Sequence, residues 1–258
     1  MRDIEKIGVS ATFDRAAKDY DDLARFQHAV CTRLLNMLPA QRTTPPRHLL
    51  DGGCGTGCGA RLLARKWGNT RITACDISLE MTRHARKKAV AAVCADMEHL
   101  PFPASCFDFV WSNLSLQWCN PHVVFQELSR VLTRDGTLLF STLVPGTLME
   151  LRTAFSGMDA HPHARPLASE ETVVRTLRKA GFSHVHTHNE TWVEQFPDLP
   201  ALLGSIRGIG AGRVGKDQRR ALMGKKMWQT VQARYQSFRT ANGMLPVTYR
   251  LLFVSARF

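Results

Sequence analysis

Apolar and polar residues follow two alternating patterns along the chain, which predict short buried strands separated by amphipathic helices. Apolar runs bounded by turn residues predict strands at 48–53, 71–76, 89–96, 107–113, 137–143, 182–192 and 246–258. Apolar residues at helical spacing predict helices at 12–38, 60–68, 79–88, 122–132, 148–158 and 170–181. Strands that are separated by helices pair in parallel through right-handed crossovers. The pattern therefore predicts an α/β fold, with a mostly parallel seven-stranded sheet and helices on both faces.

The pattern also divides the 258-residue chain, which we interpret as one domain (1–258), into parts with different roles. These parts are an N-terminal helical cap at 1–40, a core at 47–145 and a helical insertion at 197–240. The insertion contains no clear strand pattern, and its apolar residues recur at helical spacing, namely Trp228, Val231, Tyr235 and Phe238. Because loops of an α/β sheet carry function, we expect this insertion to form a lid that selects the substrate.

Composition and charge limit the classes of function. The formal net charge is +12 and the isoelectric point is near 9.8, so we expect an anionic partner: nucleic acid, an acidic protein or a small anion. Seven scattered cysteines argue against a disulfide framework and favour a reducing, cytoplasmic compartment. No apolar run is long enough to span a membrane, and residues 1–10 lack the apolar core of a secretory signal.

Two groups of possible metal ligands have simpler interpretations. Cys54 and Cys58 are four residues apart, but no second pair of ligands follows at zinc spacing. We interpret them as small residues packed around a turn. His184, His186 and His188 share one face of a predicted strand, which we interpret as a polar strand face rather than a metal site. We therefore predict no metal ion.

The sequence HLLDGGCGTG at 48–57 predicts a strand, a tight glycine-rich turn and the start of a helix. It fits neither the dinucleotide fingerprint nor the P-loop, because Cys58 occupies the sixth position of G-x-G-x-x-G and no Gly-Lys-Ser/Thr follows. The motif D-x-G-x-G-x-G instead resembles the S-adenosylmethionine loop of class I methyltransferases. An acid beside the turn suits this cofactor, which carries an ammonium and a sulfonium but no phosphate. The predicted cofactor-binding residues of the loop are Asp51, Gly53, Gly55 and Gly57.

Further cofactor contacts are expected where the following strands end. Asp76 ends the second strand, where an acid accepts hydrogen bonds from ribose hydroxyls in this fold, although it could instead compete with Ser78 as a helix N-cap. In the methyltransferases that the loop resembles, an acid after the third strand lies near the adenine amino group. Here that acid is Asp96, whose alternative role is a turn acid, and Met97 would lie beside the ring. Asn113 would lie near the methionine part. The other predicted contacts are Ile77, Met81 and Tyr20.

Distant segments make the resemblance narrower. The chain reads FDRAAKDY at 13–20, WSNLSLQWC at 111–119 and TLV at 142–144, and the insertion adds RGIGA at 207–211. Further matching residues are Gln27, Gly146, Leu148, Glu150, Leu151, Pro162, His163, Ala164, Pro246, Thr248 and Tyr249. Together these segments resemble the malonyl-acyl-carrier-protein O-methyltransferases, which begin the pimeloyl branch of biotin synthesis, over essentially the whole chain. The resemblance implies a Rossmann-like class I methyltransferase fold and S-adenosylmethionine as the methyl donor.

The resemblance implies methyl transfer to the free carboxylate of a malonyl thioester on acyl carrier protein, with malonyl-CoA as a possible substitute. That carboxylate is ionised at pH 7 and needs no general base. A buried carboxylate needs a cation, and Arg207 and Arg165 are the candidates. The chain departs from the family around Arg165, because the family commonly has Asn-Arg-Phe after the histidine near position 163. Tyr20 would fold over the cofactor and help to close the active site, unless it is a core tyrosine.

The insertion also suggests where an acidic partner docks. Residues 207–226 hold Arg207, Arg213, Lys216, Arg219, Arg220, Lys225 and Lys226 against one acid, Asp217. Because acyl carrier proteins are acidic, this segment is a candidate docking surface; the alternative is a solvated helical face. Two other functions stay open. One is a methyltransferase of another small molecule, such as a quinone. The other is a basic RNA-binding protein that uses the fold as a scaffold, although no RNA-recognition pattern is present.

Overall fold

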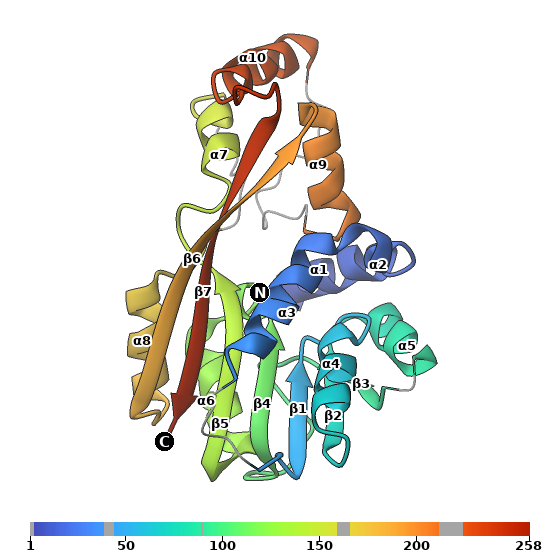
Figure 1. Ribbon diagram of the computed structural model, residues 1–258, viewed down its shortest axis with the longest axis vertical. Coiled ribbons are helices and arrows are strands. Elements are labelled where there is room, and N and C mark those ends of the chain that lie inside the picture. The colour runs from blue at the N-terminus through green and yellow to red at the C-terminus, as the bar shows by residue number, and fades with distance from the viewer. Residues whose placement is uncertain (1–2, 39–43, 89, 159–165, 212–223) are drawn as a thin grey trace.

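The computed structural model describes residues 3–38, 44–88, 90–158, 166–211 and 224–258. Its centre is a sheet of seven strands in the order β3-β2-β1-β4-β5-β7-β6 (Figure 1). The strands are β1 (His48–Gly52), β2 (Arg71–Asp76), β3 (Ala92–Cys94), β4 (Phe107–Asn113), β5 (Leu132–Leu143), β6 (His184–Phe196) and β7 (Leu245–Arg257). Strands β1 to β5 pair in parallel, whereas β7 is antiparallel to both β5 and β6. The predicted mostly parallel, seven-stranded sheet is confirmed.

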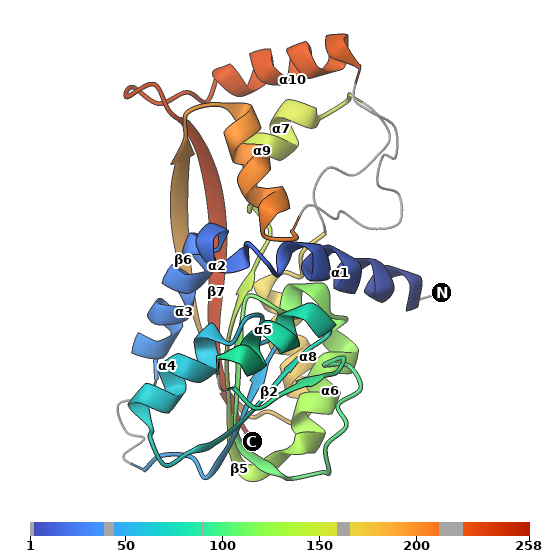
Figure 2. The same cartoon turned by 90° about the vertical axis from the view of Figure 1, so that its right-hand side faces the viewer.

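Helices cover both faces of this sheet, as predicted. They are α1 (Asp3–Ala16), α2 (Tyr20–Leu23), α3 (Arg25–Asn36), α4 (Cys58–Lys66), α5 (Leu79–Lys87), the 3-10 helix η1 (Leu116–Trp118), α6 (Pro121–Val131), α7 (Met149–Phe155), α8 (Glu170–Lys179), α9 (Leu199–Gly208) and α10 (Lys225–Gln236). Neighbouring strand residues point to opposite faces, so Leu49 packs in one core cluster with α3 and α4, and Leu50 packs in another with α6 and α8. Figure 2 shows the two helical layers on either side of the sheet.

Strands β6 and β7 continue past the other strands and carry α7, α9 and α10 at their far end (Figure 1). Val231 and Tyr235 of α10 are fully buried, and the Tyr235 hydroxyl donates a hydrogen bond to the Pro246 carbonyl at 2.8 Å. Glu150 of α7 is buried as well, and its carboxylate accepts hydrogen bonds from the backbone N–H and the hydroxyl of Thr248. The predicted helical pattern of α10 is therefore the pattern of a packed core face.

The N-terminal segment corrects the prediction of one helix at 12–38. The structure has three helices there, and the first begins at Asp3 rather than at Thr12. The chain turns after Ala16, where the Asp19 N–H donates to the Ala16 carbonyl at 3.1 Å, and again at the fully buried Ala24. A straight helix could not bury Ala24 and also place α1 across the carboxyl ends of the strands, where Figures 1 and 2 show it.

Three further element boundaries differ from the prediction. The strand predicted at 137–143 begins earlier, because Asp135 and Gly136 lie within β5, where the register changes from Phe107↔Leu132 to Phe109↔Thr137 and the additional residues of β5 bulge out. The third strand is shorter than predicted, because β3 ends at Cys94, and β6 is longer, because it continues to Phe196 along its partner β7. No helix in the described ranges is long and apolar enough to cross a membrane.

Candidate active site

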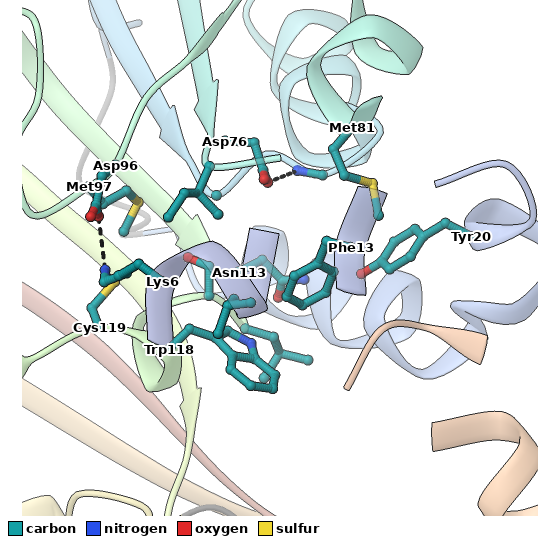
Figure 3. Close-up of a pocket in the computed structure, with 16 residues that line it drawn as sticks. Lys6, Phe13, Tyr20, Asp76, Met81, Asp96, Met97, Asn113, Trp118 and Cys119 are labelled. Atoms are coloured by element: carbon teal, nitrogen blue, oxygen red, sulfur yellow. Dashed lines mark hydrogen bonds and ion pairs between the residues drawn. The ribbon is translucent and has the colours of Figure 1, made fainter. Parts of the chain in front are cut away.

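Two adjoining cavities lie at the carboxyl ends of β1, β2 and β4, beneath α1 and α2, and Figure 3 shows the residues that line the first of them. The first is lined by Lys6, Val9, Phe13, Tyr20, Gly53, Gly55, Asp76, Ile77, Met81, Asp96, Met97, Asn113, Leu114, Ser115, Trp118 and Cys119. The second is lined by Tyr20, Gln27, His28, Cys31, Asp51, Gly53, Cys54, Gly55, Thr56, Cys58, Gly59, Trp111 and Asn113. Every predicted cofactor-binding residue except Gly57 lines one of them. Crevices at the carboxyl ends of parallel strands are the usual ligand sites of open α/β sheets.

The glycine-rich turn is held by contacts with neighbouring segments of the protein. The backbone N–H groups of Gly53 and Cys54 donate to the Cys75 carbonyl at 2.8 and 2.9 Å, which folds the turn onto β2. Gly53 has φ of 69°, and a Cβ atom there would overlap the side chain of Ser115. Gly57 has φ of 86°, acts as the N-cap of α4 and packs against Val90. Only Gly55, whose Cβ position lies 3.8 Å from Tyr20, faces the cavities without such a neighbour.

Asp76 holds the turn in place from the end of β2. Its Oδ2 accepts a hydrogen bond from the Gly55 N–H at 2.9 Å, and its Oδ1 accepts one from the Ser78 N–H at 2.8 Å. Ser78, and not Asp76, is the N-cap of α5, because its hydroxyl accepts from the Met81 N–H. Burial raises the pKa of Asp76 to about 6, although the two backbone N–H groups act in the opposite direction. The carboxylate keeps lone pairs that can accept hydrogen bonds from ribose hydroxyls.

Asp51 and Trp111 present polar atoms that the described part of the protein does not satisfy. The Oδ2 atom of Asp51 and the indole Nε1 of Trp111 are buried and have no hydrogen-bond partner among the described residues. A Cβ atom at Gly59 would lie 2.9 Å from the first and 2.7 Å from the second, so only glycine leaves this space open. Burial raises the pKa of Asp51 to about 7. The Ala60 backbone N–H acts in the opposite direction, by a hydrogen bond to this carboxylate, but Oδ2 stays without a partner among the described residues. A buried carboxylate oxygen of this kind at the edge of a cavity indicates a cationic ligand group.

Lys6 is a site residue that sequence reasoning missed. Its ammonium lies 2.9 Å from Oδ1 of Asp96 and 2.9 Å from Oε1 of Glu98, and Figure 3 shows the first of these pairs. Burial alone would lower the pKa of Lys6, but Cys119 and the two carboxylates raise it, so Lys6 stays charged. The available signal was the spacing of Lys6, Val9 and Phe13, which places all three on one face of a helix that begins at Asp3.

Aromatic rings close the first cavity on the side of the helical cap. The rings of Phe13 and Trp118 meet edge to face with centroids 5.5 Å apart, and Figure 3 shows the Tyr20 hydroxyl directed into the cavity near them. Burial raises the pKa of Tyr20 well above its usual range, so its hydroxyl remains a proton donor at neutral pH. Asn113 ties the cap to the sheet, because its side-chain amide donates to the Gln27 carbonyl at 3.1 Å.

A second group of contacts fixes the cap at the other cavity. Asp21 of α2 accepts hydrogen bonds from the Thr56 hydroxyl in the glycine-rich turn and from Lys88 at the end of α5. Burial alone would raise the pKa of Asp21, but these two partners lower it, so the carboxylate stays ionised. His28 lies 3.9 Å from the same carboxylate, and burial lowers its pKa, so the ring is neutral at pH 7.

Some predicted residues lie elsewhere. Arg207 is exposed near the C-terminal end of α9 and lines neither cavity, so its contact with substrate stays a prediction. Arg165 lies outside the described residues. His184, His186 and His188 are exposed on β6, and His188 contacts Glu190 at 3.0 Å. No group of three His, Cys, Asp or Glu side chains in the described ranges could hold a metal ion.

Comparisons with known proteins agree with this geometry. A family model described as a methyltransferase domain matches residues 50–140. The malonyl-[acyl-carrier protein] O-methyltransferase of Herminiimonas arsenicoxydans is 51% identical over 256 residues, which cover 99% of this chain and 97% of that relative. The biotin biosynthesis bifunctional protein BioHC of Saccharophagus degradans is 35% identical over 262 residues. The match covers 96% of this chain and 46% of that longer protein.

A solved structure shares the fold at low identity. The geranyl diphosphate C-methyltransferase from Streptomyces coelicolor A3(2), in complex with Mg²⁺, geranyl diphosphate and S-adenosyl-L-homocysteine, superposes with a TM-score of 0.54 at 17% identity. The match covers 91% of this chain and 80% of that chain. It confirms the predicted Rossmann-like methyltransferase fold, while the identity to the full-length relatives confirms the narrower resemblance. The chain therefore belongs to the family of malonyl-[acyl-carrier protein] O-methyltransferases.

Proposed function

We propose that this protein transfers the methyl group of S-adenosylmethionine to the free carboxylate of a malonyl thioester on acyl carrier protein. The products are the malonyl methyl ester and S-adenosylhomocysteine. The observation that carries the proposal is the 51% identity, over 99% of the chain, to a relative named for this reaction. The name of the BioHC relative supports a role in biotin biosynthesis, where the methyl ester would begin pimeloyl formation.

The cavities fit S-adenosylmethionine at several of its polar groups. The unpaired Oδ2 of Asp51 would meet the cationic ammonium of the methionine part. Asp76 would accept the ribose hydroxyls, because its carboxylate is already held in place by two backbone N–H groups. Asp96 would accept the adenine amino group, with Met97 against the ring. Ile77, Met81 and Asn113 would complete the contacts, and the predicted absence of a metal remains part of the proposal.

The reaction asks the protein for alignment rather than for acid–base chemistry. When it is bound, S-adenosylmethionine supplies an electrophilic methyl group. The malonyl carboxylate is ionised at neutral pH, so no residue has to remove a proton from it. The contribution of the chain is to hold the carboxylate in line with the methyl group and to exclude water. Phe13, Tyr20 and Trp118 support this role because they close the cavity on the cap side. The Tyr20 hydroxyl would orient the carboxylate.

A cation should hold the malonyl carboxylate, and Arg207 and Arg165 remain the candidates. Loss of a partner from a desolvated charge pair costs about 2–5 kcal/mol. Replacement of the arginine that fulfils this role by alanine should therefore lower kcat/KM for the malonyl thioester sharply and leave the affinity for S-adenosylmethionine unchanged. Full activity of both Arg207→Ala and Arg165→Ala would show that another cation binds the malonyl carboxylate.

The cap at 1–40, the core at 47–145 and the insertion at 197–240 would divide the work of the single domain (1–258). The core would bind S-adenosylmethionine, the cap would close over it, and the insertion would border the entrance for the substrate. The basic segment at 207–226 would dock the acidic acyl carrier protein; its residues 212–223 lie outside the described ranges. We place this chemistry in the cytoplasm, where acyl carrier protein and malonyl-CoA meet.

Charge reversal separates docking from chemistry. Replacement of Arg219 and Arg220 by glutamate should raise KM for malonyl-acyl carrier protein and flatten its salt dependence, because exposed charges are screened over about 8 Å at physiological ionic strength. Activity on malonyl-CoA, which lacks the carrier protein, should fall much less. Equal losses on both substrates would contradict the docking surface. A gel shift with bulk RNA and an assay with quinone acceptors test the two other functions, and we expect neither to give a signal.

A further inference from the structure

The first helix of the insertion, α9, ends in a turn that favours glycine. At the end of α9, the Ala211 N–H donates to the Ile206 carbonyl at 3.2 Å and the Gly210 N–H donates to the Arg207 carbonyl at 3.0 Å. This pair of bonds is the Schellman pattern, in which the residue after the helix adopts a left-handed conformation. Gly210 has φ of 78°, as the pattern requires. The chain therefore leaves α9 in a fixed direction.

That turn lies directly on the helical cap. A Cβ atom at Gly210 would lie 2.9 Å from Cδ1 of Phe13 and 3.2 Å from the Thr12 carbonyl oxygen, so the backbone of the insertion touches α1. A Cβ atom at Gly208 would lie 2.6 Å from Cδ1 of Leu23, in α2. Figures 1 and 2 both show the lower end of α9 beside α1 and α2. At Gly210 the backbone of the insertion thus approaches α1 too closely for a side chain to fit unless the helix shifts, whereas a side chain at Gly208 would have to displace the side chain of Leu23.

The cap residues at these contacts either line the first cavity or lie in the same helix as a residue that lines it. Phe13 lines that cavity and packs edge to face on Trp118, which lines it as well. Leu23 does not line the cavity, but it ends the short helix that begins at Tyr20, whose side chain does. The opposite side of the cap is held to the core by Lys6 and Asp14. The cap is therefore held between the core and the insertion.

We infer that Gly208 and Gly210 are positioning residues, which form a joint that couples the substrate-side insertion to closure of the cap over the methyl donor. The inference rests on the proposed function, because it assigns the substrate entrance to the insertion. When the insertion moves onto a docked substrate, the glycine turn presses on Phe13 and Leu23 and stabilises the closed cap. Linkage then requires each substrate to tighten the binding of the other by the same factor.

The chain offers matched controls for both positions. Gly204 lies in the same helix as Gly208, and Gly243 has φ of 79°, close to that of Gly210. A Cβ atom at either control position would meet no atom within 4 Å. Gly243→Ala therefore reproduces the backbone strain of Gly210→Ala without its contact with α1. Gly204→Leu likewise adds the same side chain as Gly208→Leu without its contact with α2.

The experiment measures the affinity for S-adenosylhomocysteine by calorimetry, without and with saturating malonyl-acyl carrier protein, so that no methyl group is transferred. In the wild type the carrier-bound substrate should tighten binding on the order of tenfold. Gly208→Leu and Gly210→Ala should reduce this factor to about one, whereas Gly204→Leu and Gly243→Ala should retain it. The double variant Gly208→Leu/Leu23→Ala should regain the tightening by malonyl-acyl carrier protein, because Leu23→Ala removes the side chain with which the new leucine collides. Thermal melting of each variant reports its folding.

Equal coupling in the glycine variants and their controls, or no rescue by Leu23→Ala, would overturn the joint. A wild type that does not methylate malonyl-acyl carrier protein would contradict the proposed function instead. In that case the affinity for S-adenosylhomocysteine alone still decides about the joint. Gly208→Leu should weaken it more than Gly204→Leu does, and equal affinities would overturn the inference.

Discussion

The ammonium of Lys6 and the Oδ1 atom of Asp96 lie 2.9 Å apart, which joins the first helix of the chain to the end of the third strand. The two residues are 90 positions apart in the sequence. Asp96 also accepts a hydrogen bond from the Glu98 N–H at 3.0 Å, so the same carboxylate shapes its own turn and holds the cap. The position expected to receive the adenine amino group is therefore also a point where the cap is held to the core.

Loss of the Lys6 ammonium should loosen the cap. Lys6→Met keeps most of the side chain and removes the ion pairs with Asp96 and Glu98, which are largely shielded from solvent. We expect this loss to cost about 1 kcal/mol of cap closure. The affinity for S-adenosylmethionine, measured by calorimetry, should fall roughly fivefold. Lys18→Met removes the same charge from an exposed position of the cap and should have no effect. Equal affinities of the two variants would show that the ion pairs do not hold the cap.

The second prediction concerns pH. Burial raises the pKa of Asp51 to about 7 and that of Asp76 to about 6. A cationic ligand requires the ionised Asp51, so affinity for S-adenosylmethionine should rise with pH through about 7 and fall as pH drops below it. The fall should approach about tenfold per pH unit for each carboxyl that must lose a proton. Asp51→Asn should remove the change in affinity near pH 7 and leave the change near pH 6 that Asp76 causes.

Calorimetry gives an independent check of that sign. At pH 6.5 the binding of S-adenosylmethionine should release protons, which appears as a difference in apparent enthalpy between buffers of different ionisation enthalpy. Proton uptake, or an affinity that is flat between pH 5.5 and pH 8, would contradict the assignment of Asp51 to the ammonium group.

The third prediction concerns Asp76. Asp76→Ala removes acceptors for the ribose hydroxyls, and each hydrogen bond to a charged group is worth about 1.5–3 kcal/mol. Affinity for S-adenosylmethionine should therefore fall at least tenfold. Ser78→Ala, which removes the N-cap of α5, should instead lower the free energy of unfolding by about 1 kcal/mol and affect binding less. Unchanged binding by Asp76→Ala would refute the ribose site.

The fourth prediction compares two tyrosines. The Tyr20 hydroxyl is directed into the cavity, whereas the Tyr235 hydroxyl donates to the Pro246 carbonyl in the packed end of the molecule. Tyr20→Phe should keep the melting temperature and lose turnover, measured as kcat on the malonyl thioester. Tyr235→Phe should lose about 1 kcal/mol of stability and keep its turnover. Wild-type turnover in Tyr20→Phe would leave its hydroxyl without a role in the reaction.

Local patterns were enough to predict the fold and much of the candidate site. Asp51 and Asp76 lie at the carboxyl ends of β1 and β2, and Asp96 follows β3. These strands read clearly in the sequence, and the carboxyl ends of parallel strands meet at one edge of a sheet. Lys6 was missed because its partners lie far away in the sequence. The predicted start of its helix at Thr12 also left it outside any helical face.

The glycines show a different limit of sequence reasoning. The motif indicated a ligand for Gly53 and Gly57, whereas the structure shows that Ser115 and Val90 occupy the space of their missing side chains. Gly208 and Gly210 likewise face Leu23 and Phe13. Contacts of this kind depend on tertiary packing between distant segments, which no local pattern records.

The central claim is methyl transfer to a malonyl carboxylate, and mass spectrometry of the carrier protein tests it most directly. Malonyl-acyl carrier protein and acetyl-acyl carrier protein are each incubated with the enzyme and S-adenosylmethionine. We predict that the malonyl form alone gains the mass of one methylene unit, on the acyl group, and that S-adenosylhomocysteine appears in equal amount. No mass gain on the malonyl form, or an equal gain on the acetyl form, which has no free carboxylate, would contradict the account.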